Sequence, residues 1–111
     1  TYAVSARFGS ISGLKEGAEV EIAGVKVGKV AGIALDPADY EAVVTFAIEP
    51  GVRISRDSIA SIRTSGIIGD RYVDISPGGV EEYLGPGEKI EETESAINLE
   101  QLVSKYIFEK K

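Results

Sequence analysis

The sequence predicts an all-β domain of about seven short strands, arranged as a small barrel or a sandwich and followed by one C-terminal α-helix. Three observations carry this prediction. Apolar residues alternate with polar ones along most of residues 1–94, which is the two-residue period of half-buried strands. Glycines mark the corners between these runs. After residue 95 the period changes to that of a helix.

The first half of the chain carries four of the expected strands. Residues 2–8 alternate regularly, and residues 18–35 alternate again with interruptions at Gly24 and Gly28. We expect a hairpin and either a bulge or a close backbone approach at these glycines. Residues 41–49 are rich in β-branched and aromatic side chains, which favours a fourth strand. The apolar positions of the second run are Val20, Ile22, Val25, Val27, Val30, Ile33 and Leu35.

The second half adds three shorter strands. Residues 58–64 and 71–76 are alternating runs on either side of a glycine-flanked loop, so they are expected to pair with each other. A turn rich in glycine and proline at 77–87 leads to a last strand around 88–92. Seven short strands with such corners are typical of small closed or two-layered β folds.

A helix is expected from residue 95 to the end of the chain. Asn98 followed by Gln101 resembles a capping box, and Glu100 lies where the helix dipole favours an acid. A helix of about eleven residues is marginal alone, so its apolar face must pack on sister helices or on the barrel. That face is made of Leu99, Leu102, Val103, Tyr106 and Ile107.

The amino-acid composition argues against nucleic-acid binding, most kinds of catalysis and most metal sites. The net charge of −6 disfavours nucleic acid and flat adsorption on anionic membranes as partners. The chain has no histidine and no cysteine, so it lacks the usual general base, the thiol nucleophile and most transition-metal ligands. The carboxylates at 88–94 lack the spacing of a calcium loop and are expected to be a solvated strand edge. We therefore expect that the protein is not an enzyme and that it binds neither a metal ion nor a cofactor.

The chain opens on Thr1, directly in a strand pattern and without a methionine. We expect a processed fragment from which a signal or anchor has been cut. The longest apolar runs, such as residues 31–35, fall far short of the ~20 residues of a membrane-spanning helix.

The loop SGIIGD at 65–70 is the unusual stretch of the sequence. Ile67 and Ile68 stand side by side between two glycines, although loops normally run through water. Burying one such side chain contributes roughly 1.5–3 kcal/mol, so an apolar partner is expected. The residues alone leave three partners open: the core of the domain, a sister subunit, or an apolar ligand.

Three blocks of the chain, in order, resemble a known family. They are GLKEGAEVEIAGVKVGKV (13–30), RTSGIIGDRYVDI (63–75) and SAINLEQLV (95–103). Together they resemble the MCE (mammalian cell entry) domain, most nearly its single-domain MlaD type from bacterial envelopes. The resemblance implies a compact seven-stranded β-barrel at 1–94, an assembly helix at 95–111, and an N-terminal membrane anchor that these residues do not include.

The resemblance also implies a function. Proteins of this type form homohexameric rings in the periplasm, anchored in the inner membrane on the permease and ATPase subunits of an ABC transporter. Phospholipid passes through the central pore, which maintains outer-membrane lipid asymmetry. Ile67 and Ile68 would line this pore, where leucines are usual, and the two glycines of the loop would supply unusual backbone angles. The pore-loop backbone would be Ser65, Gly66, Gly69 and Asp70.

Simple energetics agree with a lipid conduit. Each CH₂ of a lipid tail in water costs roughly 0.8 kcal/mol, so a pore that carries lipid must be lined by apolar groups. Ile67 and Ile68 would find that apolar neighbour in an assembled ring. The alternative hypothesis is a structural or adhesive β-barrel whose isoleucine loop docks a protein partner. A further possibility is that the 111-residue chain alone is a monomer without a pore.

Overall fold

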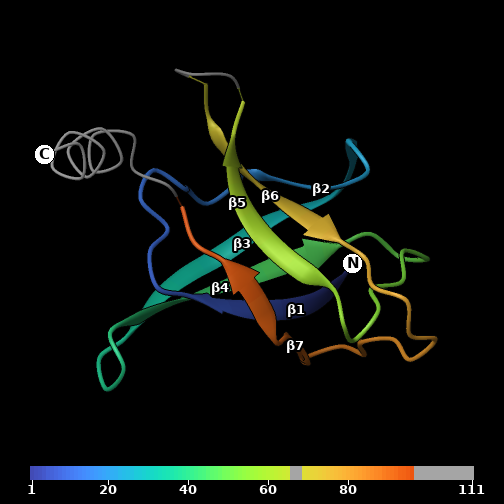
Figure 1. The fold of residues 1–111 in the computed structure, drawn as a ribbon. Helices are drawn as coiled ribbons and strands as arrows, with labels where there is room; N and C mark the ends of the chain where they lie inside the picture. The colour runs from blue at the N-terminus through green and yellow to red at the C-terminus, as the bar shows by residue number, and fades with distance from the viewer. Residues whose placement is uncertain (66–68, 97–111) are drawn as a thin grey trace, which may run out of the picture.

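The computed structural model describes residues 1–65 and 69–96, which form eight β-strands and no helix (Figure 1). The all-β class is therefore confirmed for these residues. The helix predicted at 95–111 falls almost wholly outside them. The strands are β1 (Tyr2–Phe8), β2 (Glu19–Ile22), β3 (Val25–Asp36), β4 (Glu41–Ile48), β5 (Ile59–Thr64), β6 (Arg71–Ser76), β7 (Lys89–Ile90) and β8 (Glu92–Glu94).

The strands form one sheet in the order β7-β1-β4-β3-β2-β6-β5-β8, which curls into a nearly closed barrel. The two outermost strands are consecutive in the chain and are separated only by Glu91. β7 pairs in parallel with β1, and β8 pairs in parallel with β5. One run of chain therefore joins both edges of the sheet. Of the two architectures that the sequence left open, the barrel is the correct one.

The predicted count of seven strands is wrong by one, and the barrel's closure gives the reason. The single strand expected around residues 88–92 is divided at Glu91, where the chain leaves β1 and begins to pair with β5. The two-residue period breaks at this change of partner, because Glu91 and Glu92 are both exposed after the buried Ile90. A run with a single apolar residue is too short for the sequence pattern to show that break.

Alternating side chains fill the barrel. In β4, Val44, Phe46 and Ile48 are fully buried, and the residues between them are half-buried. β1 and β6 follow the same two-residue period. The other fully buried large side chains come from β1, β2, β3, β6 and the loop before β5: Phe8, Ile54, Ile75, Val4, Val20, Val30 and Val73. This core supports the strand ends from which the functional loops leave.

Both glycines that interrupt the second run are explained by the structure. Gly24, with φ of 79°, makes the turn between β2 and β3. Gly28 instead marks a close approach, because a Cβ there would collide with the carbonyl oxygen of Ala47 on β4. The β2–β3 register also shifts between Val20 and Glu21, as a bulge requires.

Candidate functional site

The β5–β6 hairpin carries the candidate site. Its strand pairing ends at Thr64 and Arg71, and the Ser65 amide then donates a hydrogen bond of 3.0 Å to the carbonyl oxygen of Asp70. The hairpin is thus hydrogen-bonded up to the first and last residues of the predicted loop. Gly66, Ile67 and Ile68 lie outside the described residues, so the pore-lining role of the two isoleucines stays a prediction.

Gly69 is needed in this loop for a reason that the sequence did not indicate. The unusual backbone angle expected at Gly69 depends on the position of Ile68, outside the described residues, so it stays a prediction. A Cβ on Gly69 would collide with the carbonyl oxygen of Ser65. The loop backbone closes so tightly at this point that a side chain cannot be accommodated without moving Ser65 or Gly69.

The loop between β1 and β2 packs against the base of the hairpin. Gly13, with φ of 88°, lies under the side chain of Arg71, since a Cβ there would be 2.9 Å from Arg71 Nε. A small hollow of about 340 Å³ runs between the two loops, past Lys15 and Asp70. The position of the hairpin base therefore depends on a second loop that is distant in the sequence.

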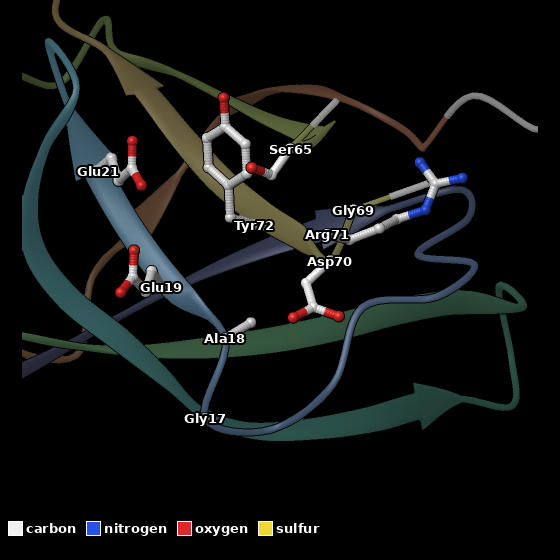
Figure 2. A pocket seen from close by; sticks show the side chains of 9 residues that line it. All are labelled: Gly17, Ala18, Glu19, Glu21, Ser65, Gly69, Asp70, Arg71 and Tyr72. Atoms are coloured by element: carbon white, nitrogen blue, oxygen red, sulfur yellow. The ribbon is translucent and has the colours of Figure 1, made fainter. Parts of the chain in front are cut away.

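A larger cleft of about 620 Å³ opens between β2 and the base of the hairpin. Figure 2 shows the side chains of Glu19 and Glu21 on β2 and the ring of Tyr72 on β6 beside this space. Burial raises the pKa of the Glu21 carboxyl, and a hydrogen bond with Glu19 and the negative charges of Glu19 and Asp74 raise it further. The remaining lining residues are Gly17, Ala18, Ser65, Gly69, Asp70 and Arg71.

The chemistry of this cleft limits what it can bind. Carboxylates on its wall would repel a phosphate group, and a polar lining gives no stabilisation to an acyl chain. Within residues 1–65 and 69–96, no three histidine, cysteine or acidic side chains are grouped to hold a metal ion. The described lining of this cleft therefore offers little apolar surface for a lipid tail.

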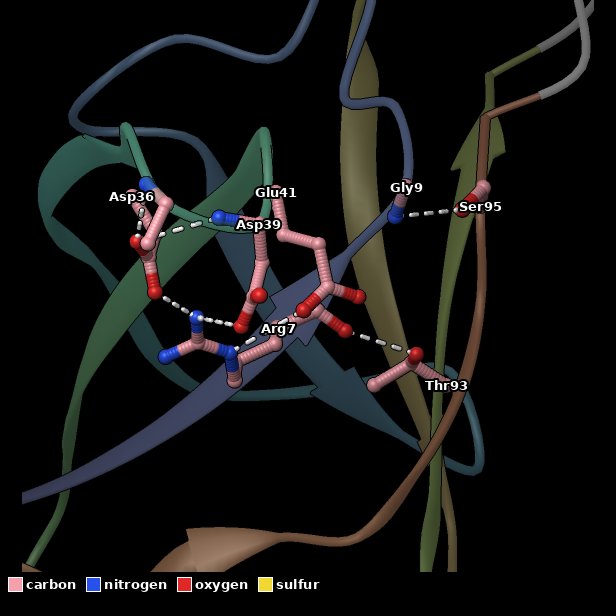
Figure 3. Close-up of polar contacts among 8 residues, drawn as sticks. Arg7, Gly9, Asp36, Asp39, Glu41, Thr93 and Ser95 are labelled. Carbon is pink, nitrogen blue, oxygen red and sulfur yellow. Dashed lines mark hydrogen bonds and ion pairs between the residues drawn. The ribbon is translucent and has the colours of Figure 1, made fainter.

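The segment before the predicted helix, residues 93–96, is hydrogen-bonded to the end of β1 and the first residues of the β1–β2 loop. Thr93 Oγ1 donates to the carbonyl oxygen of Arg7 at 2.7 Å, and the Gly9 amide donates to Ser95 Oγ at 3.0 Å (Figure 3). The Ala96 amide donates to the carbonyl oxygen of Ser10 at 3.0 Å. The described chain therefore ends beside the β1–β2 loop.

The structure brings part of the predicted site together. Ser65, Gly69 and Asp70 meet at the base of the hairpin. Gly13 and Arg71 both lie inside blocks that carry the family resemblance. The sequence analysis did not identify their contact, because no spacing rule links residues so far apart. The predicted helix face lies outside the described residues: Leu99, Leu102, Val103, Tyr106 and Ile107.

The part of the chain that the structure describes contains no helix long and apolar enough to cross a bilayer.

Comparisons with known proteins agree with one another. The sequence model of a family described as "MlaD protein" matches residues 1–78. The chain is 40% identical over 114 residues to the intermembrane phospholipid transport system binding protein MlaD of Escherichia coli K12, covering 97% of this chain and 62% of that protein. The Haemophilus influenzae protein of the same description is 37% identical over 112 residues, covering 97% and 67%.

Solved structures include a similar fold. A chain of the Acinetobacter MlaFEDB complex in an ATP-bound conformation superposes with a TM-score of 0.88. It is 26% identical in sequence, and the match covers 95% of this chain and 80% of that one. The present chain spans 62% of the length of the Escherichia coli relative, so it corresponds to a part of that protein.

Proposed function

Because the chain belongs to the MlaD family, we propose that it is the phospholipid-binding component of an ABC lipid transport system and has no catalytic activity of its own. The family match carries this proposal, since the two curated relatives are described as phospholipid transport binding proteins. The similar solved chain comes from a complex in an ATP-bound conformation. That supports permease and ATPase subunits as partners.

The proposed assembly is a homohexameric ring around a central pore. Each copy would present Ile67 and Ile68 to the axis from the β5–β6 hairpin. The hydrogen bond between Ser65 and Asp70 and the tight closure at Gly69 support a loop that holds its residues beyond the sheet. An apolar constriction suits lipid tails, because each CH₂ exposed to water costs roughly 0.8 kcal/mol.

The proposed setting is the periplasm. Residues 1–94 would be the barrel domain of a single-pass inner-membrane protein, anchored by an N-terminal helix that precedes Thr1 in the whole protein. Residues 95–111 would be a helix that gathers with its copies through its apolar face. The hydrogen bonds from Gly9 and Ala96 support this, because they hold the start of that segment against the barrel. Such a system would maintain the lipid asymmetry of the outer membrane.

Site-specific photo-cross-linking tests the lipid contact. A benzophenone amino acid at position 67 of the membrane-anchored protein should form a phospholipid adduct in cells, and one at Val25 should not. Val25 is a suitable control because it is 63% exposed on a different part of the barrel. An adduct with one protein partner and none with lipid would overturn the proposal in favour of a docking module.

A double variant tests whether the contact matters. Ile67→Asn with Ile68→Asn should leave the fold and the ring intact but abolish co-purified phospholipid and envelope function. The reason is that Asn keeps a side chain of moderate size and removes the apolar surface. Normal lipid content and normal function in this variant would contradict the proposed pore. Val25→Asn controls for the general effect of a surface asparagine.

A further inference from the structure

The end of the β3–β4 hairpin exposes two large apolar side chains to water. Tyr40 is 79% exposed and Leu35 is 65% exposed. Tyr40 also has φ of 54°, a left-handed conformation that is rare for a bulky residue and costs free energy. Strained residues cluster at functional sites, and tyrosine is enriched among the residues that dominate binding at protein interfaces.

The turn is also held rigidly. The Tyr40 amide donates to the Asp36 carbonyl oxygen at 2.8 Å, and the Ala38 amide donates to Asp36 Oδ1 at 2.9 Å. Arg7 on β1 forms ion pairs with the carboxylates of Asp36, Asp39 and Glu41 (Figure 3). Three carboxylates share one guanidinium, so the turn keeps an excess of negative charge. Such a preorganised projection loses little entropy when it binds. We call Leu35, Asp39 and Tyr40, at the end of the β3–β4 hairpin, the hairpin tip. It is distinct from the β5–β6 hairpin of the candidate site.

A complementary surface lies around the first residues of β1. It is a shallow hollow of about 310 Å³, lined mostly by apolar atoms. The guanidinium of Arg53 lies 5.2 Å from the centre of the Tyr83 ring, and no carboxylate among the described residues pairs with it. The volume is at the small end of ligand pockets, which suits one or two side chains better than a phospholipid. The other lining residues are Tyr2, Gly51, Val52, Leu84 and Pro86.

The β3–β4 turn lies on the opposite side of the barrel from the segments that line the hollow, which are the start of β1, the loop after β4 and the loop before β7 (Figure 1). β1 and β4 run between them, with Tyr2 paired to Ile48 near the hollow and Phe8 paired to Ala42 near the tip. Seven residues of strand span roughly 20 Å, so the two surfaces cannot meet within one chain. A head-to-tail contact requires two complementary surfaces at different places on one molecule, and it forms a ring when the rotation between neighbours closes.

We propose that the hairpin tip of one copy binds in the Arg53–Tyr83 hollow of the next copy and forms the contact between neighbours in the ring. Tyr40 and Leu35 enter the apolar hollow, and Asp39 approaches Arg53. The β5–β6 hairpin leaves the barrel on a third side (Figure 1) and stays free to face the axis. This inference rests on the proposed ring, and it adds which surfaces of the subunit close it.

Sedimentation velocity and native mass measurement of the 111-residue chain test the contact. Tyr40→Asp should weaken self-association by about thirty-fold or more, the loss typical of a hot-spot aromatic. Tyr40→Gly suits the left-handed backbone, so it should weaken association without loss of stability in urea unfolding. Val25→Asp, at an exposed apolar position outside both surfaces, should associate as the wild type does.

Mixing experiments distinguish a head-to-tail contact from a symmetric one. Tyr40→Asp keeps an intact hollow and Arg53→Glu keeps an intact tip, so the two variants should each be monomeric alone and form a one-to-one dimer together. A chain with both Asp39→Lys and Arg53→Glu should regain part of its association, because the charges are exchanged across the contact.

Each other outcome overturns the inference. Association unchanged in Tyr40→Asp and Tyr40→Gly would place the ring contact elsewhere, and a wild-type chain that stays monomeric at all concentrations would remove it. Mixed species larger than dimers would contradict the head-to-tail geometry. Lipid cross-linking at position 67 is measured separately, so failure of this contact is distinguishable from failure of the lipid role.

Discussion

Replacing Gly69 with alanine tests how the functional loop is closed. A Cβ at this position collides with the Ser65 carbonyl oxygen, a backbone atom that cannot rotate away as a side chain can. Either the Ser65 carbonyl turns and the hydrogen bond from Ser65 to Asp70 is lost, or the loop stays closed under strain. In both cases the change acts at the base of the loop, one residue away from Ile68.

The magnitude follows from these two routes. A lost hydrogen bond costs about 0.5–1.5 kcal/mol, and local backbone strain costs about 1–3 kcal/mol. Replacing glycine also restricts the unfolded chain, which offsets about 0.4–1 kcal/mol. The net cost is on the order of 1–2 kcal/mol for closing the loop, which corresponds to roughly 5- to 30-fold more frequent opening.

Amide hydrogen exchange measures this opening directly. The Ser65 amide, which donates to Asp70, should exchange roughly 5- to 30-fold faster in Gly69→Ala, while amides in β1 and β4 keep their rates. Gly79→Ala is the matched control, because a Cβ there meets open space in another surface loop. In the membrane-anchored protein, Gly69→Ala should also reduce lipid cross-linking from position 67.

Unchanged exchange at Ser65 would refute the reasoning, because it would mean that the loop accommodates a Cβ without any loss of closure. Faster exchange throughout the barrel would refute it as well, since the collision would then not be confined to the hairpin. A reduced cross-link in Gly79→Ala would show that the lipid assay reports general destabilisation.

Two further predictions concern the barrel. A hydrogen bond from Arg7 lowers the pKa of the Asp36 carboxyl, so its stabilisation is present above the ordinary aspartate pKa of about 3.9 and is lost as pH falls through the folded value. Arg7→Gln should therefore unfold at lower urea than the wild type at pH 7, and a urea series down to about pH 2 should show the difference shrinking; a difference independent of pH would contradict this. Ile75 is fully buried, so Ile75→Val should cost about 0.5–1.5 kcal/mol and Ile75→Ala about 2–5 kcal/mol in urea unfolding. Equal effects of the two substitutions would argue against a well-packed core at this position.

The strands were predictable because their signal is local. Alternation in residues 2–8 and 41–49 depends only on neighbouring side chains, and the structure places β1 and β4 there. The same alternation failed to show that Val25 and Leu35, at the ends of β3, are exposed. Exposure depends on which parts of a strand reach beyond the barrel, and that depends on partners distant in the sequence.

The candidate site was predictable only in part for the same reason. The apolar pair between two glycines is visible in six residues of sequence, and so is the family resemblance. Three other contacts are not visible in the sequence: the collision of a Cβ at Gly69 with Ser65, the packing of Arg71 over Gly13, and the ion pairs of Arg7. Each joins groups whose separation along the chain follows no fixed spacing, so each becomes visible only when the barrel is assembled.

The way the barrel closes also orders events during synthesis. β7 and β8 complete both edges of the sheet, and they are the last strands of the described chain to leave the ribosome. Until Glu94 has been made, the nascent domain carries two open edges, which are the surfaces through which unfinished β proteins associate wrongly. The next two residues, Ser95 and Ala96, bond to Gly9 and Ser10. The same short stretch of translation therefore pairs both open edges and fastens the end of the described chain to the residues that follow β1.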